Sequence, residues 1–111
     1  MPFPSFADRF PALDVPFPET VVSTHALRSD AGLMVMFDFH RDVDLPAHSH
    51  GAQWGTVIRG SVELTIDGET RIYHPGDTYE IAAGVVHAVR VPAGSQAIDI
   101  FAEADRYPLK D

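Results

Sequence analysis

The sequence predicts an all-β protein folded as one domain, in the form of a sandwich or small barrel. Its 111 residues are enough for a hydrophobic core without cross-links. Short runs rich in β-branched and aromatic residues alternate with turn signals through most of the chain. No long run has helical spacing, and only one short helical turn is expected, at 102–107. Many short antiparallel strands in so small a domain are typical of sandwiches and small barrels.

The first 19 residues predict an arm that precedes a single barrel domain at 20–111. They hold five of the nine prolines and four of the seven phenylalanines. Such proline density excludes a long helix and favours extended backbone. The aromatic side chains need a surface to cover. The arm is therefore expected either to lie along its own domain or to cross to the partner subunit of a homodimer.

Eight strands are expected after the arm, each bounded by a turn signal. They span 20–28, 33–40, 53–59, 61–66, 69–74, 78–82, 86–91 and 96–102. The strongest hairpin signal is Asp67-Gly68, because a type I′ turn needs positive φ at both central residues. Turn residues at 29–32, 75–77 and 92–95 separate other neighbouring strands.

Composition excludes several classes of function. The chain has no cysteine, so a bound metal must be held by nitrogen and oxygen. The formal net charge of −8 disfavours nucleic acid and anionic membrane surfaces. No apolar run approaches the roughly 18 residues that span a bilayer, and the first residues lack the basic and apolar regions of a signal peptide. A cytoplasmic protein with no membrane or nucleic-acid partner is expected.

Three histidines and a glutamine form the pattern of a metal site. His48 and His50 are one residue apart, and in an extended segment such a pair directs both imidazoles to one face. Gln53 follows closely, and His87 ends a later turn-rich segment. Three imidazoles and one amide oxygen would hold one divalent transition metal, such as Zn, Ni, Mn, Fe or Cu.

Strand alternation assigns roles to the neighbours of this group. Gly55 shares the face of Gln53 and would leave room beside the metal, so it is a candidate pocket residue. Trp54 falls on the opposite face and is expected to pack. The other histidines lack the spacing of ligands, and surface or structural roles are expected for His25, His40 and His74.

Two motifs resemble those of small single-domain members of the cupin family, over roughly residues 33–103. The first family motif contains His-x-His, an acidic ligand and a glycine, and the second contains two glycines and a histidine. The positions that match are His48, His50, Gly60, Gly76, Gly84 and His87, with Gln53 where the family has glutamate. The resemblance implies a jelly-roll barrel, also called a double-stranded β-helix. Asp42, Ala82 and Val91 depart from the family pattern at turns and strand ends.

The glutamine changes the expected charge of the site. With three neutral imidazoles and a neutral amide, a divalent ion keeps its full formal charge, which a glutamate would partly cancel. Such a centre should be a stronger Lewis acid and should attract carboxylate or enolate oxygens. It should also disfavour trivalent iron.

The last strand supplies a candidate acid or base. Alternation places Ile98 and Ile100 on one face and Asp99 and Phe101 on the other. If the isoleucines face outward, Asp99 enters the barrel, where burial could tune its pKa for proton transfer. This segment resembles the end of cupins that linearise unsaturated uronates from pectin and alginate. That resemblance implies catalytic Asp99 with Phe101 and Arg106 in the pocket, although Arg106 lies one residue later than the family spacing.

Three functions are consistent with the sequence. The first is a metal-dependent enzyme that isomerises or tautomerises a small oxygen-rich anion, such as a sugar acid or keto acid, with Asp99 moving a proton. The second is an iron-dependent dioxygenase. The third is a module that binds or senses a small molecule without turnover.

Overall fold

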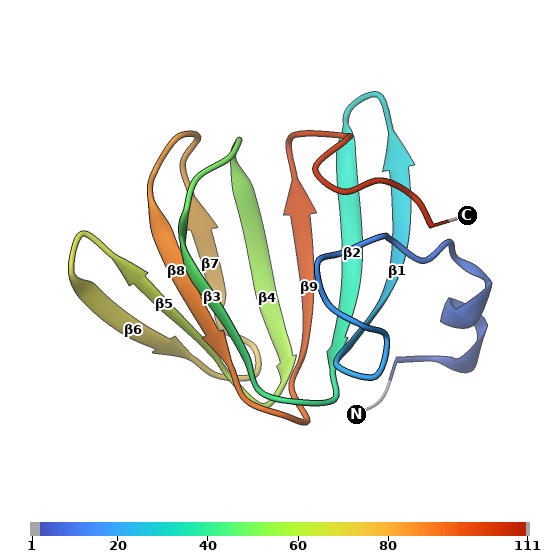
Figure 1. Cartoon of the computed structure of the whole chain (residues 1–111), viewed down its shortest axis with the longest axis horizontal. Coiled ribbons are helices and arrows are strands. Elements are labelled where there is room, and N and C mark those ends of the chain that lie inside the picture. Colours follow the sequence, from blue (N-terminus) through green and yellow to red (C-terminus); the bar gives the residue numbers. More distant parts are fainter. Residues whose placement is uncertain (1–2, 111) are drawn as a thin grey trace.

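The computed structural model describes residues 3–110, which form two antiparallel β-sheets facing each other (Figure 1). A 3-10 helix, η1, opens the described chain at Ser5–Arg9. One sheet has the order β1-β2-β9-β4-β7 and the other the order β3-β8-β5-β6. The strands span Val22–Ser29 (β1), Gly32–Phe39 (β2), Val43–His48 (β3), Gln53–Arg59 (β4), Val62–Ile66 (β5), Glu69–Tyr73 (β6), Thr78–Ile81 (β7), His87–Val91 (β8) and Gln96–Phe101 (β9). The all-β jelly-roll architecture is the one that the sequence predicts.

The core lies between the two sheets and follows the expected alternation of side chains. Val35, Val57 and Ile81 are among the fully buried side chains of the five-stranded sheet. They face Leu64 and Val91 from the other sheet within one continuous apolar cluster. Burial of these inward faces is the main favourable contribution to folding.

The tightest hairpin forms where the sequence predicts it. Asp67 and Gly68 connect β5 to β6 with φ values of 53° and 76°, as a type I′ turn requires. Ile66 and Glu69 pair directly across this turn.

The structure differs from the expected local details in three places. β3 was not expected as a strand, because Asp44 and Pro46 interrupt its apolar residues. Proline removes a ladder donor, and it is tolerated here because β3 is an edge strand. The arm is not wholly extended, since η1 forms within it. Residues 102–107 form turns and bends instead of a helical turn.

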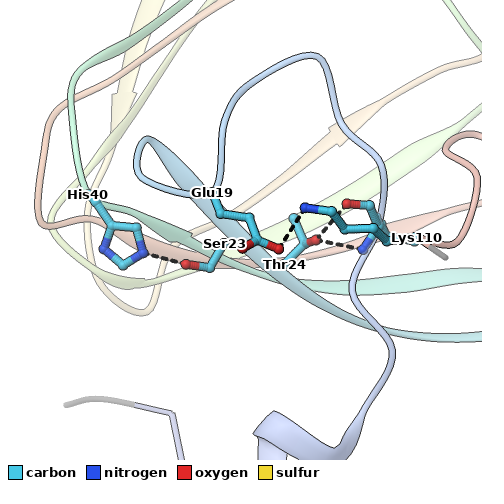
Figure 2. A network of polar contacts seen from close by, with 6 residues as sticks. Glu19, Ser23, Thr24, His40 and Lys110 are labelled. Carbon is cyan, nitrogen blue, oxygen red and sulfur yellow. Dashed lines mark hydrogen bonds and ion pairs between the residues drawn. The ribbon is translucent and has the colours of Figure 1, made fainter.

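In this structure the arm lies along its own domain. Leu13 is buried and bridges to Leu109 of the C-terminal tail, so the arm and tail run side by side near β1 (Figure 1). The hydroxyl of Thr24 accepts a hydrogen bond from the Leu13 N–H at 2.9 Å. An exposed ion pair of 2.6 Å between Lys110 and Glu19 also links tail and arm (Figure 2). Among residues 3–110 there is no helix long and apolar enough to cross a membrane.

Candidate metal centre and cavity

A β-bulge directs His48 into the barrel. In β3, Leu45 pairs with Val89 of β8, but the next pair is His48 with His87, so β3 contains one extra residue. Strict alternation from Val43 and Leu45 would place Ala47 inside and His48 outside. The bulge reverses this order, because an extra residue shifts the side chains that follow it to the opposite face. His48 therefore lines the cavity between the sheets, and Ala47 is exposed.

The three histidines of the predicted site converge at one end of the barrel. His48 ends β3, His50 lies in the following loop, and His87 begins β8. Each offers a ring nitrogen, and these three atoms all lie within 4.8 Å of one another. The His-x-His pair is thus convergent, although His50 is outside the strand that was expected to align both rings.

Backbone carbonyls fix the tautomer of all three rings. The Nδ1 atom lies 2.8 Å from Pro46 O in His48, 2.8 Å from Gly51 O in His50 and 2.9 Å from Val85 O in His87. A carbonyl only accepts, so each neutral ring donates from Nδ1 and leaves Nε2 as a lone pair. This is how histidine ligands are commonly oriented toward metals.

The environment keeps two of these rings neutral. Burial lowers the pKa of His50 and of His87 below the ordinary value, although each hydrogen bond to a carbonyl acts in the opposite direction. The buried Nε2 of His87 has no hydrogen-bond partner among the described residues. An unpartnered, unprotonated nitrogen beside two others fits a divalent transition metal better than it fits a purely structural role.

A hydrogen-bonded group of Gln53, Asp99 and Tyr79 adjoins the histidines. The Gln53 amide donates to Asp99 Oδ1 at 2.9 Å, and the Tyr79 hydroxyl donates to the same oxygen at 2.7 Å. Ile100 is exposed and Asp99 is buried, so the last strand has the orientation that places Asp99 inside. The amide nitrogen of Gln53 is held by Asp99, which leaves its oxygen as the available metal ligand.

Gly55 makes this group possible. In the sheet register it pairs with Tyr79 on one side and with Asp99 on the other. A Cβ atom at Gly55 would lie 2.2 Å from Asp99 Oδ1 and 2.4 Å from the Tyr79 ring. The missing side chain therefore gives space to the Tyr79–Asp99 contact, not to open cavity, and Gly55 is not among the lining residues.

Burial sets the protonation of the two acids in this group. Desolvation raises the pKa of Asp99 from 3.8 to about 6, and the hydrogen bonds from Tyr79 and Gln53 lower it only in part. Burial also raises the pKa of Tyr79 well above its ordinary value, so its hydroxyl keeps its proton and remains a donor. Asp99 can thus hold or release a proton close to neutral pH.

A cavity of about 70 Å³ joins these groups. It has room for several water molecules. Phe101 and Arg106, both expected in the pocket, line it together with Tyr107. The Arg106 guanidinium carbon lies 4.3 Å from the centre of the Tyr107 ring, and its Nε is buried without a partner among residues 3–110. The structure thus provides an uncompensated cation near the histidines.

The other histidines lie away from this centre. His25 contacts Phe10 O and Asp8 of the arm at 3.0 and 3.5 Å. His40 makes a close contact with the Ser23 hydroxyl on the outside of the barrel (Figure 2), and His74 is exposed. Trp54 is partly exposed on the outer face of its sheet.

Sequence reasoning missed Tyr79 and Tyr107. The Thr78–Ile81 strand does indicate that Tyr79 and Ile81 share an inward face. The pairing of Tyr79 with Asp99, however, depends on which strands flank β4, which no local pattern reveals.

Comparisons with known proteins agree with this fold. The family model of the cupin domain matches residues 34–101 of this chain. The structure of KdgF from Halomonas sp. is similar, with a TM-score of 0.73 and 25% identity, over 88% of this chain and 93% of that one. An RmlC-like cupin from Shewanella frigidimarina NCIMB 400 has a TM-score of 0.76 and 22% identity, over 92% and 91%. Oxalate decarboxylase from Bacillus subtilis, a protein with Mn(II) centres, has a TM-score of 0.63 and 18% identity, over 80% and 28%. A search of curated proteins gave no match.

Proposed function

The chain belongs to the cupin family, and from that premise we propose that it binds one divalent transition metal and isomerises or tautomerises a small oxygen-rich anion. The proposed ligands are His48, His50, Gln53 and His87. The convergence of three imidazoles, each with Nδ1 committed to a carbonyl, is the observation that carries the proposal. The likeness to a Mn(II) cupin agrees with it at the level of the fold.

A divalent ion bound there supplies Lewis acidity toward a carbonyl or enol oxygen. The side chains of the protein provide proton transfer and anion binding. Both described hydrogen bonds to Asp99 end on Oδ1, so Oδ2 is the oxygen that can take or return a proton. A group whose pKa lies near neutrality is suited to general acid–base catalysis. Arg106, whose buried Nε has no hydrogen-bond partner among residues 3–110, offers its guanidinium to a carboxylate of the substrate.

Metal content tests the first half of this proposal. Elemental analysis of the purified wild type should find one transition metal near stoichiometric amount. The His48→Ala variant should lose most of it, because one of three converging nitrogens is removed. The His74→Ala variant is the matched control, since His74 is exposed and belongs neither to the cluster nor to the cavity lining. Equal metal in all three proteins would exclude the proposed ligand set.

Proton transfer tests the second half. The metal-loaded protein should catalyse exchange of the C3 protons of pyruvate for deuterium in D₂O, followed by NMR. Asp99→Asn should retain the metal and lose most of the exchange. Ligand binding without any exchange would favour a binding module, and oxygen uptake by the Fe(II)-loaded protein would favour a dioxygenase.

A homodimer in the cytoplasm is also proposed, and the outer face of the five-stranded sheet supports the dimer. The register aligns four apolar side chains across β1, β2, β9 and β4, namely Leu27, Met34, Ile100 and Trp54. Three of them are more than a third exposed in a chain with a net charge of −8. Apolar and aromatic side chains with few charges are typical of interface centres. Light scattering should give a dimer mass that Trp54→Glu reduces to the monomer.

A further inference from the structure

The cavity that contains the histidines has one polar end and one apolar end. All of its polar lining residues belong to the histidine cluster, to the Asp99 group or to the C-terminal tail. Its remaining lining side chains are hydrocarbon or aromatic: Val15, Pro16, Phe17, Val22, Phe37, Phe39, Val43, Leu45, Val62, Leu64, Val89, Val91, Ala97 and Phe101. No serine, threonine, asparagine, lysine or glutamate is among the described lining residues.

The register shows how far the apolar part extends. β8 runs from His87 at the polar end to Val91, and β3 runs from His48 back to Val43. At roughly 3.3 Å per residue, these strands carry the lining about 13 to 16 Å away from the histidines. The arm contributes Val15, Pro16 and Phe17 to the same wall. The apolar part thus continues inward from the histidine end, and in a cavity of about 70 Å³ it has room for a small substituent of a few carbons.

Hydroxyl groups would be poorly accommodated there. β8 pairs with β3 on one side and with β5 on the other, so the backbone along the middle of this sheet is engaged in ladder hydrogen bonds. The lining side chains of these three strands carry no polar atom beyond the histidines, and the polar lining of the opposite sheet is confined to the Gln53, Asp99 and Tyr79 group. A hydroxyl that leaves water without a new partner costs roughly a factor of ten in affinity. A polyhydroxylated chain would incur that loss at several positions.

We propose that the ligand of this site is a small 2-oxo acid with an apolar alkyl or aryl substituent, not a polyhydroxylated sugar acid. The inference rests on the proposed function, because that function places the carboxylate and oxo groups among the histidines and Arg106. It adds that the substituent occupies the Val, Leu and Phe lining. Leu45, Leu64 and Val89 are the side chains that a substituent meets first beyond the histidines.

A chain-length series measures this preference directly. Calorimetric titration of the Zn²⁺-loaded protein would use pyruvate, 2-oxobutanoate, 2-oxopentanoate and 2-oxohexanoate. Affinity should rise about fourfold for each added methylene, or about 60-fold over the series, because each buried methylene contributes about 0.8 kcal/mol. The six-carbon acid 2-keto-3-deoxygluconate should bind at least tenfold more weakly than 2-oxohexanoate, since it carries hydroxyl groups on the chain carbons where 2-oxohexanoate carries only hydrogen.

Two variants locate the substituent. Val89→Thr exchanges a methyl for a hydroxyl at nearly constant volume in the lining, and it should weaken 2-oxohexanoate several-fold while pyruvate is unaffected. Val86→Thr is the matched control, because Val86 is exposed and does not line the cavity. A flat series, tighter binding of the hydroxylated acid, or no binding of any 2-oxo acid would overturn the inference. Metal content that depends on His48 would leave the proposed metal site standing in each of those cases.

Discussion

Gly55→Ala is expected to destabilise the protein strongly, although alanine normally stabilises extended backbone relative to glycine. The new Cβ would lie 2.2 Å from Asp99 Oδ1 and 2.4 Å from the Tyr79 ring. Ordinary contacts need about 1 Å more than this, and neither neighbour can simply turn into solvent, because both are at most 5% exposed.

The magnitude follows from three effects. Overpacking a well-filled interior costs about 1 to 3 kcal/mol. Separation of the Tyr79 hydroxyl from Asp99 leaves buried polar atoms unpaired, at a further cost of about 1 to 3 kcal/mol. The lower entropy of the unfolded chain offsets about 0.4 to 1 kcal/mol. The net loss in the free energy of unfolding should be about 1 to 5 kcal/mol, with about 3 kcal/mol at the centre of the range.

Urea unfolding at neutral pH is the assay, and Gly51→Ala is the matched control. Gly51 has no positive φ, and the three atoms nearest to its Cβ would all belong to Glu103, an exposed side chain that can turn into solvent at the cost of its hydrogen bond to the Gly51 N–H. That variant should change stability by less than about 1 kcal/mol. With an m value of about 1.5 kcal/mol/M, a loss of about 3 kcal/mol should lower the urea midpoint of Gly55→Ala by about 2 M, against less than about 0.7 M for Gly51→Ala.

A double-mutant cycle identifies the cause. Asp99→Ala removes the oxygen with the closest contact, so Gly55→Ala should cost less in that background, by more than about 0.5 kcal/mol. Equal stability of the Gly55→Ala and Gly51→Ala proteins would refute the reasoning. So would a cycle in which the two changes are simply additive.

Three further variants test the electrostatics. Burial raises the pKa of Asp99 from 3.8 to about 6, so the stability that its proton contributes is full below about pH 4 and is lost as the pH rises through about 6. The assay is urea unfolding with EDTA, and the quantity is the stability of the wild type minus that of Asp99→Asn. This difference should fall by about 3 kcal/mol between about pH 4 and pH 7, because the buried imidazoles titrate alike in both proteins and cancel. A difference that stays constant would contradict this. Arg106→Gln should retain the metal and lose at least about tenfold in pyruvate affinity, because a charged hydrogen bond is removed; unchanged affinity would exclude Arg106 as the anion contact. Lys110→Gln should leave the urea midpoint unchanged, because its ion pair with Glu19 is exposed; a clear decrease would show that this pair holds the arm.

The sequence was sufficient to predict the sheet class, eight of the nine described strands and the convergence of three histidines. Those features depend on local alternation, turn residues and spacing. The sequence did not predict how His48 is oriented. Its orientation depends on a β-bulge in β3, an edge strand that was not recognised because it contains a proline. The spacing of His48 and His50 alone does not show which face of the sheet the two rings occupy.

The Asp99 group shows where local patterns cease to be informative. Asp99, Gly55 and Tyr79 are far apart in the sequence and become neighbours only because β4 lies between β7 and β9. Gly55 was expected to leave room beside the metal, and it does create space, but the register fills that space with Tyr79 and Asp99. The chemical consequence was therefore different from the one expected.

The hydrogen bond between Gln53 and Asp99 also explains how an amide can stand where related motifs have a glutamate. Donation from the Gln53 amide to Asp99 directs the amide oxygen away from the carboxylate. A negative charge on Asp99 polarises that amide and makes its oxygen a better donor to a cation. The carboxylate thus contacts the amide nitrogen of the proposed ligand Gln53, and its pKa of about 6 lets it change protonation near neutral pH. A directly coordinated glutamate would be held ionised by the metal and could not act in this way.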